Sequence, residues 1–181
     1  IEQPAEHTAP SPELAVVTIV DQDTLNEWLE RLANAPLFAF DTETTSLNYM
    51  QAEIVGVSFA VTAGEAAYVP LAHISPGLEG QLNREHVLEQ LRPLLESEDL
   101  KKVGQHLKYD ANVLVNHGIT LRGIAHDTML ESYVIDAVGS RHDMGSLALK
   151  YLGQRVISFE EVAGKGAKQV SFDHVDIERA A

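Results

Sequence analysis

The sequence predicts an α/β fold with a mixed β-sheet, and three observations support this. Short apolar segments rich in β-branched residues, typical of strands, come first along the chain. Segments with apolar residues at helical spacing follow and dominate its second half. No internal repeat interrupts this order, and 181 residues at 45% hydrophobic content suffice for one domain with a buried core.

The first part of the chain contains the predicted linker and most of the predicted strands. Pro4, Pro10 and Pro12 stand among small and polar residues, so residues 1–14 are predicted to form an interdomain linker. Asp21 or Asp23 is the expected N-cap of the first helix. The predicted elements here are strands over 15–20, 37–43, 53–61 and 65–71, a hairpin turn over 62–64, and a helix over 21–35.

Helices dominate the second part of the chain. Asn83 and Asp127 are the expected N-caps of two of them, and Gly118 is the expected end of a third. The predicted elements here are helices over 83–97, 107–118, 128–138 and 143–153, a short strand over 101–105, a mobile basic loop over 163–169, and a final helix that begins near Asp173.

Composition narrows the class of protein. No apolar run approaches the roughly 20 residues that span a bilayer, and the N-terminus has neither the basic nor the apolar region of a signal peptide. Cys is absent, which excludes disulfides and thiolate metal sites and fits a cytoplasmic location. The first residue is not Met, which suggests an internal piece of a longer protein. The formal net charge of −14 argues against a broad basic face, so any nucleic-acid site must be local.

Two carboxylates close the apolar strand predicted over 37–43. Asp41 and Glu43 are two residues apart, so their side chains point to the same face of the sheet. Two such groups repel each other unless a cation lies between them, and their hard oxygen atoms suit Mg²⁺ or Mn²⁺. The alternative is a solvated strand end. The chain repeats this spacing at 21–23 and 176–178, so on the residues alone both interpretations stay open.

A third acid stands where the predicted strand over 101–105 runs into the next helix. Gly104 lies at the bend, and Asp110 falls in the first or second helical turn. In isolation, an acid near a helix N-terminus is most simply explained by the helix dipole. Beside Asp41 and Glu43, it becomes a third candidate ligand from a separate element.

Several strings of residues, taken in order, carry a resemblance to a known family. They are FAFDTETTSL (38–47), VGQHLKYD (103–110), DTMLESYVI (127–135), RHDMGSLALKYL (141–152) and FEEVAGKG (159–166). From about residue 15 to the end, the chain closely resembles the 3′→5′ proofreading exonuclease domain of bacterial DNA polymerase I. That domain belongs to the superfamily of exonucleases named for four acids, Asp-Glu-Asp-Asp. The resemblance implies a ribonuclease H-like mixed sheet flanked by helices, with the exonuclease domain over 15–181.

The resemblance also implies an activity. Such domains are metal-dependent enzymes that hydrolyse the 3′-terminal phosphodiester of single-stranded or mismatched DNA with two divalent cations, Mg²⁺ or Mn²⁺. Asp41, Glu43 and Asp110 match the catalytic, metal-ligating acids, with Asp41 bridging both ions. The implied partners are a single-stranded DNA 3′ end, a C-terminal polymerase domain and an N-terminal 5′-nuclease domain of the same chain. The implied location is the bacterial cytoplasm, with no membrane partner.

Further positions match the substrate contacts of the family. Leu47 and Phe159 correspond to apolar side chains that pack against the terminal bases, and such stacking tolerates any sequence. His106 stands where relatives of polymerase I usually have Asn. The remaining predicted substrate-binding residues are Thr42, Thr44, Gln105, Lys108, Tyr109 and Arg141.

One part of the family pattern is absent from the 181 residues. The last motif, Tyr-x-x-x-Asp, would follow on the helix that begins near Asp173, and it supplies the fourth acid and a Tyr that orients the attacking water. Residues 1–181 alone are therefore expected to show weak or no turnover. Two alternatives are a non-catalytic exonuclease-fold domain that braces a polymerase and a stand-alone RNA-trimming exonuclease. The three retained acids argue against the first, and the Pro-rich leader and closer match to polymerase I argue against the second.

Overall fold

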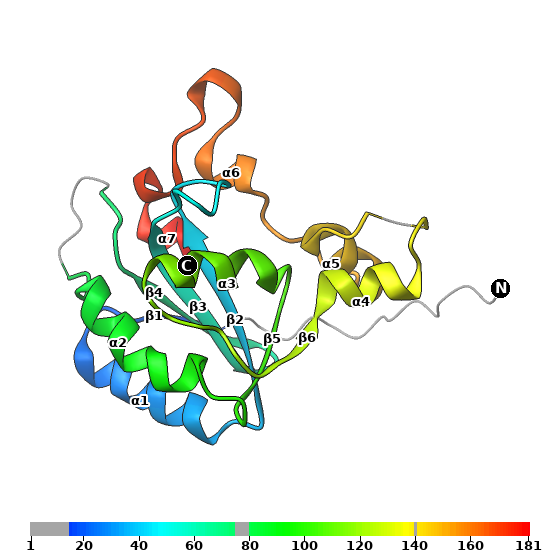
Figure 1. The fold of residues 1–181 in the computed structure, drawn as a ribbon. Coiled ribbons are helices and arrows are strands. Elements are labelled where there is room, and N and C mark those ends of the chain that lie inside the picture. The colour runs from blue at the N-terminus through cyan, green and yellow to red at the C-terminus, as the bar shows by residue number, and fades with distance from the viewer. Residues whose placement is uncertain (1–14, 75–79, 140) are drawn as a thin grey trace.

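The computed structural model describes residues 15–74, 80–139 and 141–181, so the predicted linker over 1–14 lies outside the described residues. Within these ranges a six-stranded mixed sheet has the order β1-β4-β3-β2-β5-β6 (Figure 1). This confirms the predicted α/β fold. The strands are β1 (Ala15–Thr18), β2 (Leu37–Thr44), β3 (Ile54–Thr62), β4 (Glu65–Pro70), β5 (Lys101–Gly104) and β6 (Ile124–Asp127).

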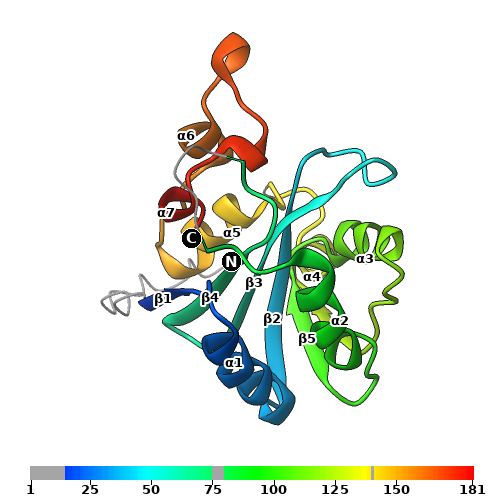
Figure 2. The same cartoon turned by 90° about the vertical axis from the view of Figure 1, so that its left-hand side faces the viewer.

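Strand β2 lies in the interior of the sheet, and Figure 2 shows β1, β4, β3, β2 and β5 following one another in this order. Strand β2 pairs antiparallel with β3 and parallel with β5. The β3–β4 hairpin closes with Thr62 opposite Glu65, as predicted. The pairing with β5 reaches only Ala39 opposite Val103, so the last residues of β2 are paired with β3 alone. This leaves one side of β2 open where its carboxylates stand.

Two helices that cover the sheet begin at the predicted caps. The Asp21 carboxylate accepts a hydrogen bond from the backbone N–H of Thr24 at 2.8 Å, and Asn83 does the same for His86 at 2.9 Å. No helix in the described ranges is both long and apolar enough to cross a membrane. The helices are α1 (Gln22–Asn34), α2 (Arg84–Leu95), α3 (Leu107–Asn116), α4 (Thr128–Ile135), α5 (Met144–Leu152), α6 (Phe159–Ala163) and α7 (Ile177–Ala180).

The two faces of the sheet carry different layers. On one face, Phe38 and Phe40 of β2 belong to the main core with buried residues of α1, α2 and α3. On the other face, Val55 of β3 packs with Ala163, Phe172 and other residues near the C-terminus. Figure 1 shows α6 and α7 near the end of β2, and α4 and α5 beyond β6. The polar end of β2 is therefore flanked by the late part of the chain.

The structure differs from the prediction at several boundaries. The final helix begins at Ile177, and residues Phe172–His174, where the helix was expected to begin, form a separate 3₁₀ helix. Helix α4 ends at Ile135, because Asp136 has left the helical conformation. Neither β6 nor α6 was predicted, and the expected loop over 163–169 contains the end of α6 and a second 3₁₀ helix.

Candidate functional site

Asp41 and Glu43 lie on the face of β2 opposite the main core. Alternate residues of a strand point to opposite faces, and Thr42 between them is buried with the core side. Across the sheet, Asp41 is paired with Ser58 of β3, and Glu43 with Gly56. The prediction that the two carboxylates share one face is therefore confirmed.

Asp110 reaches this end of β2 from helix α3. A Cβ added to Gly104, the last residue of β5, would lie 2.8 Å from the carbonyl oxygen of Phe40, so the backbone at this position must carry no side chain. The chain then turns into α3, and Asp110 falls in its first turn with 2% of its surface exposed. The backbone N–H and the hydroxyl of Thr42 both donate to Asp110 Oδ1, at 3.0 and 2.6 Å. These bonds hold Asp110 against the open side of β2.

The three carboxylates interact strongly with one another. Burial raises the pKa of Asp41 to about 8, with further increases from the charges of Asp110 and Glu43. Burial and the charge of Asp110 raise the pKa of Glu43 to about 7. Burial also raises the pKa of Asp110, against the opposing effect of the two hydrogen bonds from Thr42. In the described residues no Lys, Arg or His forms an ion pair with any of the three.

The donor set fits a divalent cation. Buried carboxylates without a cationic partner are costly, and a bound metal ion removes that cost. Across the described ranges, however, no three Asp, Glu or His side chains are close enough to hold one ion. Asp110 directs one oxygen to Thr42 rather than to the other acids. The predicted ligand set of Asp41, Glu43 and Asp110 is thus brought to one end of β2 but not into closed coordination geometry.

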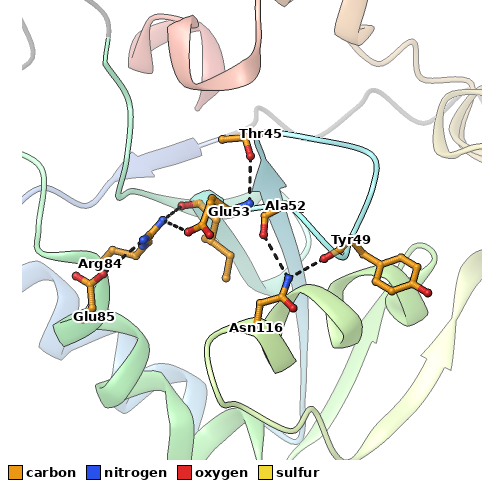
Figure 3. A network of polar contacts seen from close by, with 8 residues as sticks. Thr45, Tyr49, Ala52, Glu53, Arg84, Glu85 and Asn116 are labelled. Atoms are coloured by element: carbon orange, nitrogen blue, oxygen red, sulfur yellow. Dashed lines mark hydrogen bonds and ion pairs between the residues drawn. The ribbon is translucent and has the colours of Figure 1, made fainter.

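Leu47 projects from the loop that joins β2 to β3, with 95% of its surface exposed. This excludes ordinary core packing for its side chain. The base of the loop is fixed by hydrogen bonds from Thr45 N to Glu53 O and from Glu53 N to Thr45 Oγ1, both 3.1 Å (Figure 3). Asn116 of α3 donates to the carbonyl of Tyr49 at 2.7 Å, and Arg84 of α2 pairs with Glu53 at 2.8 Å. These contacts fix the base of a loop that carries an exposed apolar side chain.

Tyr109 and Thr44 link this loop to α3. The Tyr109 hydroxyl donates to the carbonyl of Ser46 and lies 2.6 Å from Thr44 Oγ1. The hydroxyl of Thr42 donates a hydrogen bond to Asp110, as described above. The predicted contacts of these three side chains with substrate stay predictions, and the structure gives each of them a protein partner.

The other predicted substrate contacts lie near the start of α3 and beyond α4. The Gln105 amide donates to the carbonyl of His142 at 2.7 Å and accepts from Thr128, whereas Lys108 is exposed. His106 is exposed and has a φ of 62°, a left-handed conformation that Asn and His adopt more readily than most residues. The Arg141 side chain is 86% exposed and pairs with Asp143 at 3.1 Å.

Phe159 lies at the start of α6 and is 48% exposed. Its ring stacks on Phe172 with the centroids 6.3 Å apart. Both rings line a cavity of about 860 Å³, which also includes Glu43 and Arg155. The structure therefore brings Phe159 to the same cavity as one of the predicted metal ligands. Asp41 lines a separate, smaller cavity of about 170 Å³ with Ser58 and Met144.

Sequence reasoning identified Asp127 only as a helix cap, and the structure gives it a larger role. Its carboxylate accepts from Met129 N and Leu130 N in α4, as a cap does. It also accepts from His106 N at 3.1 Å and from Leu107 N at 2.9 Å, at the start of α3. One side chain thus fixes the N-termini of α3 and α4. The sequence signal was an Asp directly before the helix that became α4. It gave no indication that the same side chain also caps α3.

Comparisons with known proteins identify the family of this chain. The chain matches a family model described as 3′-5′ exonuclease over residues 16–175. It is 60% identical to DNA polymerase I of Pseudomonas aeruginosa over 164 residues, which is 90% of this chain and 18% of that protein. It is 44% identical to DNA polymerase I of Rhizobium leguminosarum over 190 residues, which is 96% of this chain and 19% of that protein. The chain therefore spans less than a fifth of the length of these relatives.

Solved structures share the fold at low sequence identity. The EXO domain of Aedes aegypti Nibbler aligns with a TM-score of 0.63 at 12% identity, covering 92% of this chain and 83% of that one. Brucella melitensis NrnC with bound Mg²⁺ aligns with a TM-score of 0.52 at 19% identity, covering 82% and 65%. These likenesses confirm the expected ribonuclease H-like α/β fold. Because the family model matches nearly the whole described sequence, the chain belongs to the 3′-5′ exonuclease family, in the form found in DNA polymerase I.

Proposed function

We propose that this chain is a proofreading domain that hydrolyses the 3′-terminal phosphodiester of single-stranded or mismatched DNA. The observation that carries the proposal is the set of three mutually repelling carboxylates from β2 and α3, which has no ion-pair partner among the described residues. In a member of the 3′-5′ exonuclease family, such a set is best explained as a site for divalent cations.

Asp41, Glu43 and Asp110 would hold two divalent cations, Mg²⁺ or Mn²⁺. The Mg²⁺ bound to the fold relative NrnC supports this choice of metal. When bound, the cations supply activation of the attacking water and stabilisation of the leaving 3′-oxygen. Thr42 contributes by holding Asp110 in place through its two hydrogen bonds.

The proposed DNA contacts surround the acids. Exposed Leu47 and half-exposed Phe159 pack against the terminal bases, which requires no particular sequence. Gln105, His106, Lys108, Tyr109 and Arg141 lie along the path of the DNA backbone. Since the chain carries a net charge of −14, binding of duplex DNA is provided by another domain of a longer protein. The two polymerase relatives support a polymerase domain as that partner, and a 5′-nuclease domain is proposed on the other side of the linker.

The test compares intact wild-type protein with the Asp41→Ala variant on a 5′-end-labelled single-stranded oligonucleotide in Mg²⁺ or Mn²⁺. We expect loss of at least about 100-fold in the rate of 3′-end removal, because one of the side chains that would hold the cations is gone. Asp23→Ala is the matched control, since Asp23 is an exposed acid of another i, i+2 pair and lies on α1. Equal degradation by Asp41→Ala and wild type would contradict the proposal.

A further inference from the structure

His73 is buried in the segment that follows β4, with 4% of its surface exposed and both ring nitrogens engaged. Nδ1 lies 2.8 Å from the carbonyl oxygen of Val175, and Nε2 lies 2.7 Å from the Tyr68 hydroxyl. A carbonyl only accepts, so Nδ1 carries the proton, and in the neutral ring Nε2 accepts from Tyr68. Burial lowers the pKa of His73, which agrees with the neutral form. The Gln81 side chain further fixes the His73 backbone with two hydrogen bonds of 2.8 Å.

Tyr68 connects His73 to the strand that carries the acids. It is paired across the sheet with Ser58, which is in turn paired with Asp41, so the three residues share one face. The Tyr68 ring leans over Gly56, and a Cβ at Gly56 would lie 2.1 Å from the Tyr68 hydroxyl oxygen. Gly56 is the direct partner of Glu43. The ring therefore fills the space beside Glu43 that a side chain at position 56 would otherwise occupy.

On its other side, His73 contacts the late segment that supports Phe159. Its ring lies 5.9 Å from that of Phe172, whose ring stacks on Phe159. The backbone N–H of Ile74 donates to the carbonyl of Asp173 at 2.7 Å, next to the bond from His73 to Val175. Phe172 and Val175 are both buried. The segment 172–175 is thus fastened to the sheet through residues 73 and 74.

We propose that His73 is a positioning residue for the exonuclease site. It holds Phe159 at a fixed place relative to the strand that bears Asp41 and Glu43. This rests on the proposed function, because Phe159 acts as the base contact. The path runs from the acids through Tyr68 and His73 to Phe172 and Phe159. Tyr68 is linked to the acids by strand pairing through Ser58 and Gly56, and the later links are a hydrogen bond and packed rings. Loss of His73 therefore releases the base contact without removing the acids.

A double-mutant cycle in the intact protein tests this. We expect His73→Ala to lower kcat/KM on a single-stranded oligonucleotide about fivefold and Phe159→Ala about tenfold, mainly through KM, since stacking of one base accounts for losses of this size. The double variant should be no worse than Phe159→Ala alone, because both changes remove the same contact. A merely structural role predicts that the two effects multiply, and that result would overturn the proposal.

Two controls separate positioning from stability. Asp21→Ala removes the carboxylate that caps α1 through Thr24, on a helix that carries none of the proposed site residues, and should lower the Tm while leaving kcat/KM unchanged. If His73→Ala does not fold, Tyr68→Phe keeps the ring over Gly56 and removes only the hydroxyl that His73 accepts from, and the same cycle applies to it. Coupling below twofold with Phe159 in both backgrounds contradicts the proposal.

The same cycle, measured as oligonucleotide binding by fluorescence anisotropy in an Asp41→Ala background, distinguishes this inference from the proposed function. An inactive wild-type protein refutes the exonuclease assignment, whereas the binding cycle still reports whether His73 acts through Phe159. Additive losses of binding would refute the role of His73 even if the wild type degrades DNA.

Discussion

Asp110 and Thr42 show how a single pair of residues determines the character of the site. Thr42 gives both of its donors to one oxygen of Asp110, which favours the charged form of that carboxylate although it is buried. Within the described residues, no such donors reach Asp41 or Glu43, and their pKa values rise to about 8 and about 7. Three acids of similar intrinsic strength are thereby separated by their surroundings.

Without metal, the stability of the domain should fall as the pH rises from about 4 to about 8. In that window the folded protein retains protons on Asp41 and Glu43 that the unfolded chain has already released, so raising the pH favours unfolding. In EDTA we expect the Tm to drop by about 5 °C between pH 5 and pH 8. Asp41→Asn should flatten this dependence, because the amide does not titrate. Differential scanning fluorimetry measures both.

Addition of Mg²⁺ or Mn²⁺ provides the complementary measurement. At pH 8 the cation should raise the Tm of wild type more than that of Asp41→Asn, because only the wild type offers all three carboxylates of Asp41, Glu43 and Asp110. A wild-type Tm that is constant across the pH range in EDTA would contradict the raised pKa values.

At the scale of elements, the sequence predicted those strands and helices whose signal lies within a few neighbouring residues. Strand β2 follows from its apolar run, which ends at the two acids, and α1 and α2 follow from their caps and periodicity. Strand β6 was missed because it has four residues, of which the first three are exposed, so no apolar pattern marks it. Asp110 lies 68 residues from the Thr42 that holds it, so no local pattern predicted their hydrogen bonds, and the sequence offered Asp110 only as a candidate ligand that the family resemblance then supported.

Asp127 joins helices α3 and α4, and this contact should have a measurable effect on stability. It accepts backbone hydrogen bonds from the first residues of both α3 and α4. Asp127→Ala should therefore lower the free energy of unfolding by about 3 kcal/mol, because buried donors at two helix ends lose their partner. Asp143→Ala, which removes the cap of one helix, α5, and an exposed ion pair with Arg141, should cost about 1 kcal/mol. Urea denaturation of the two variants gives the comparison, and equal losses would show that Asp127 serves one helix alone.

At the scale of the whole molecule, charge and family pattern lead to the same expectation. The net charge of −14 disfavours binding of DNA. The 181 residues include three of the four acids expected from the family pattern. A site that lacks one ligand and the water-orienting Tyr should bind its cations weakly. We therefore expect the acids at the end of β2 to be necessary for the proposed chemistry but insufficient for it.

We therefore predict that residues 1–181, expressed alone, remove 3′-terminal nucleotides at least about 100-fold more slowly than the intact protein in the same Mg²⁺ or Mn²⁺ concentration. The physical reason is the missing fourth ligand rather than misfolding, so circular dichroism should show a folded α/β domain. A version extended through the Tyr-x-x-x-Asp motif should recover most of the rate, and changing that Asp to Ala should abolish the recovery. Robust metal-dependent degradation by residues 1–181 would instead mean that Asp41, Glu43 and Asp110 suffice for catalysis.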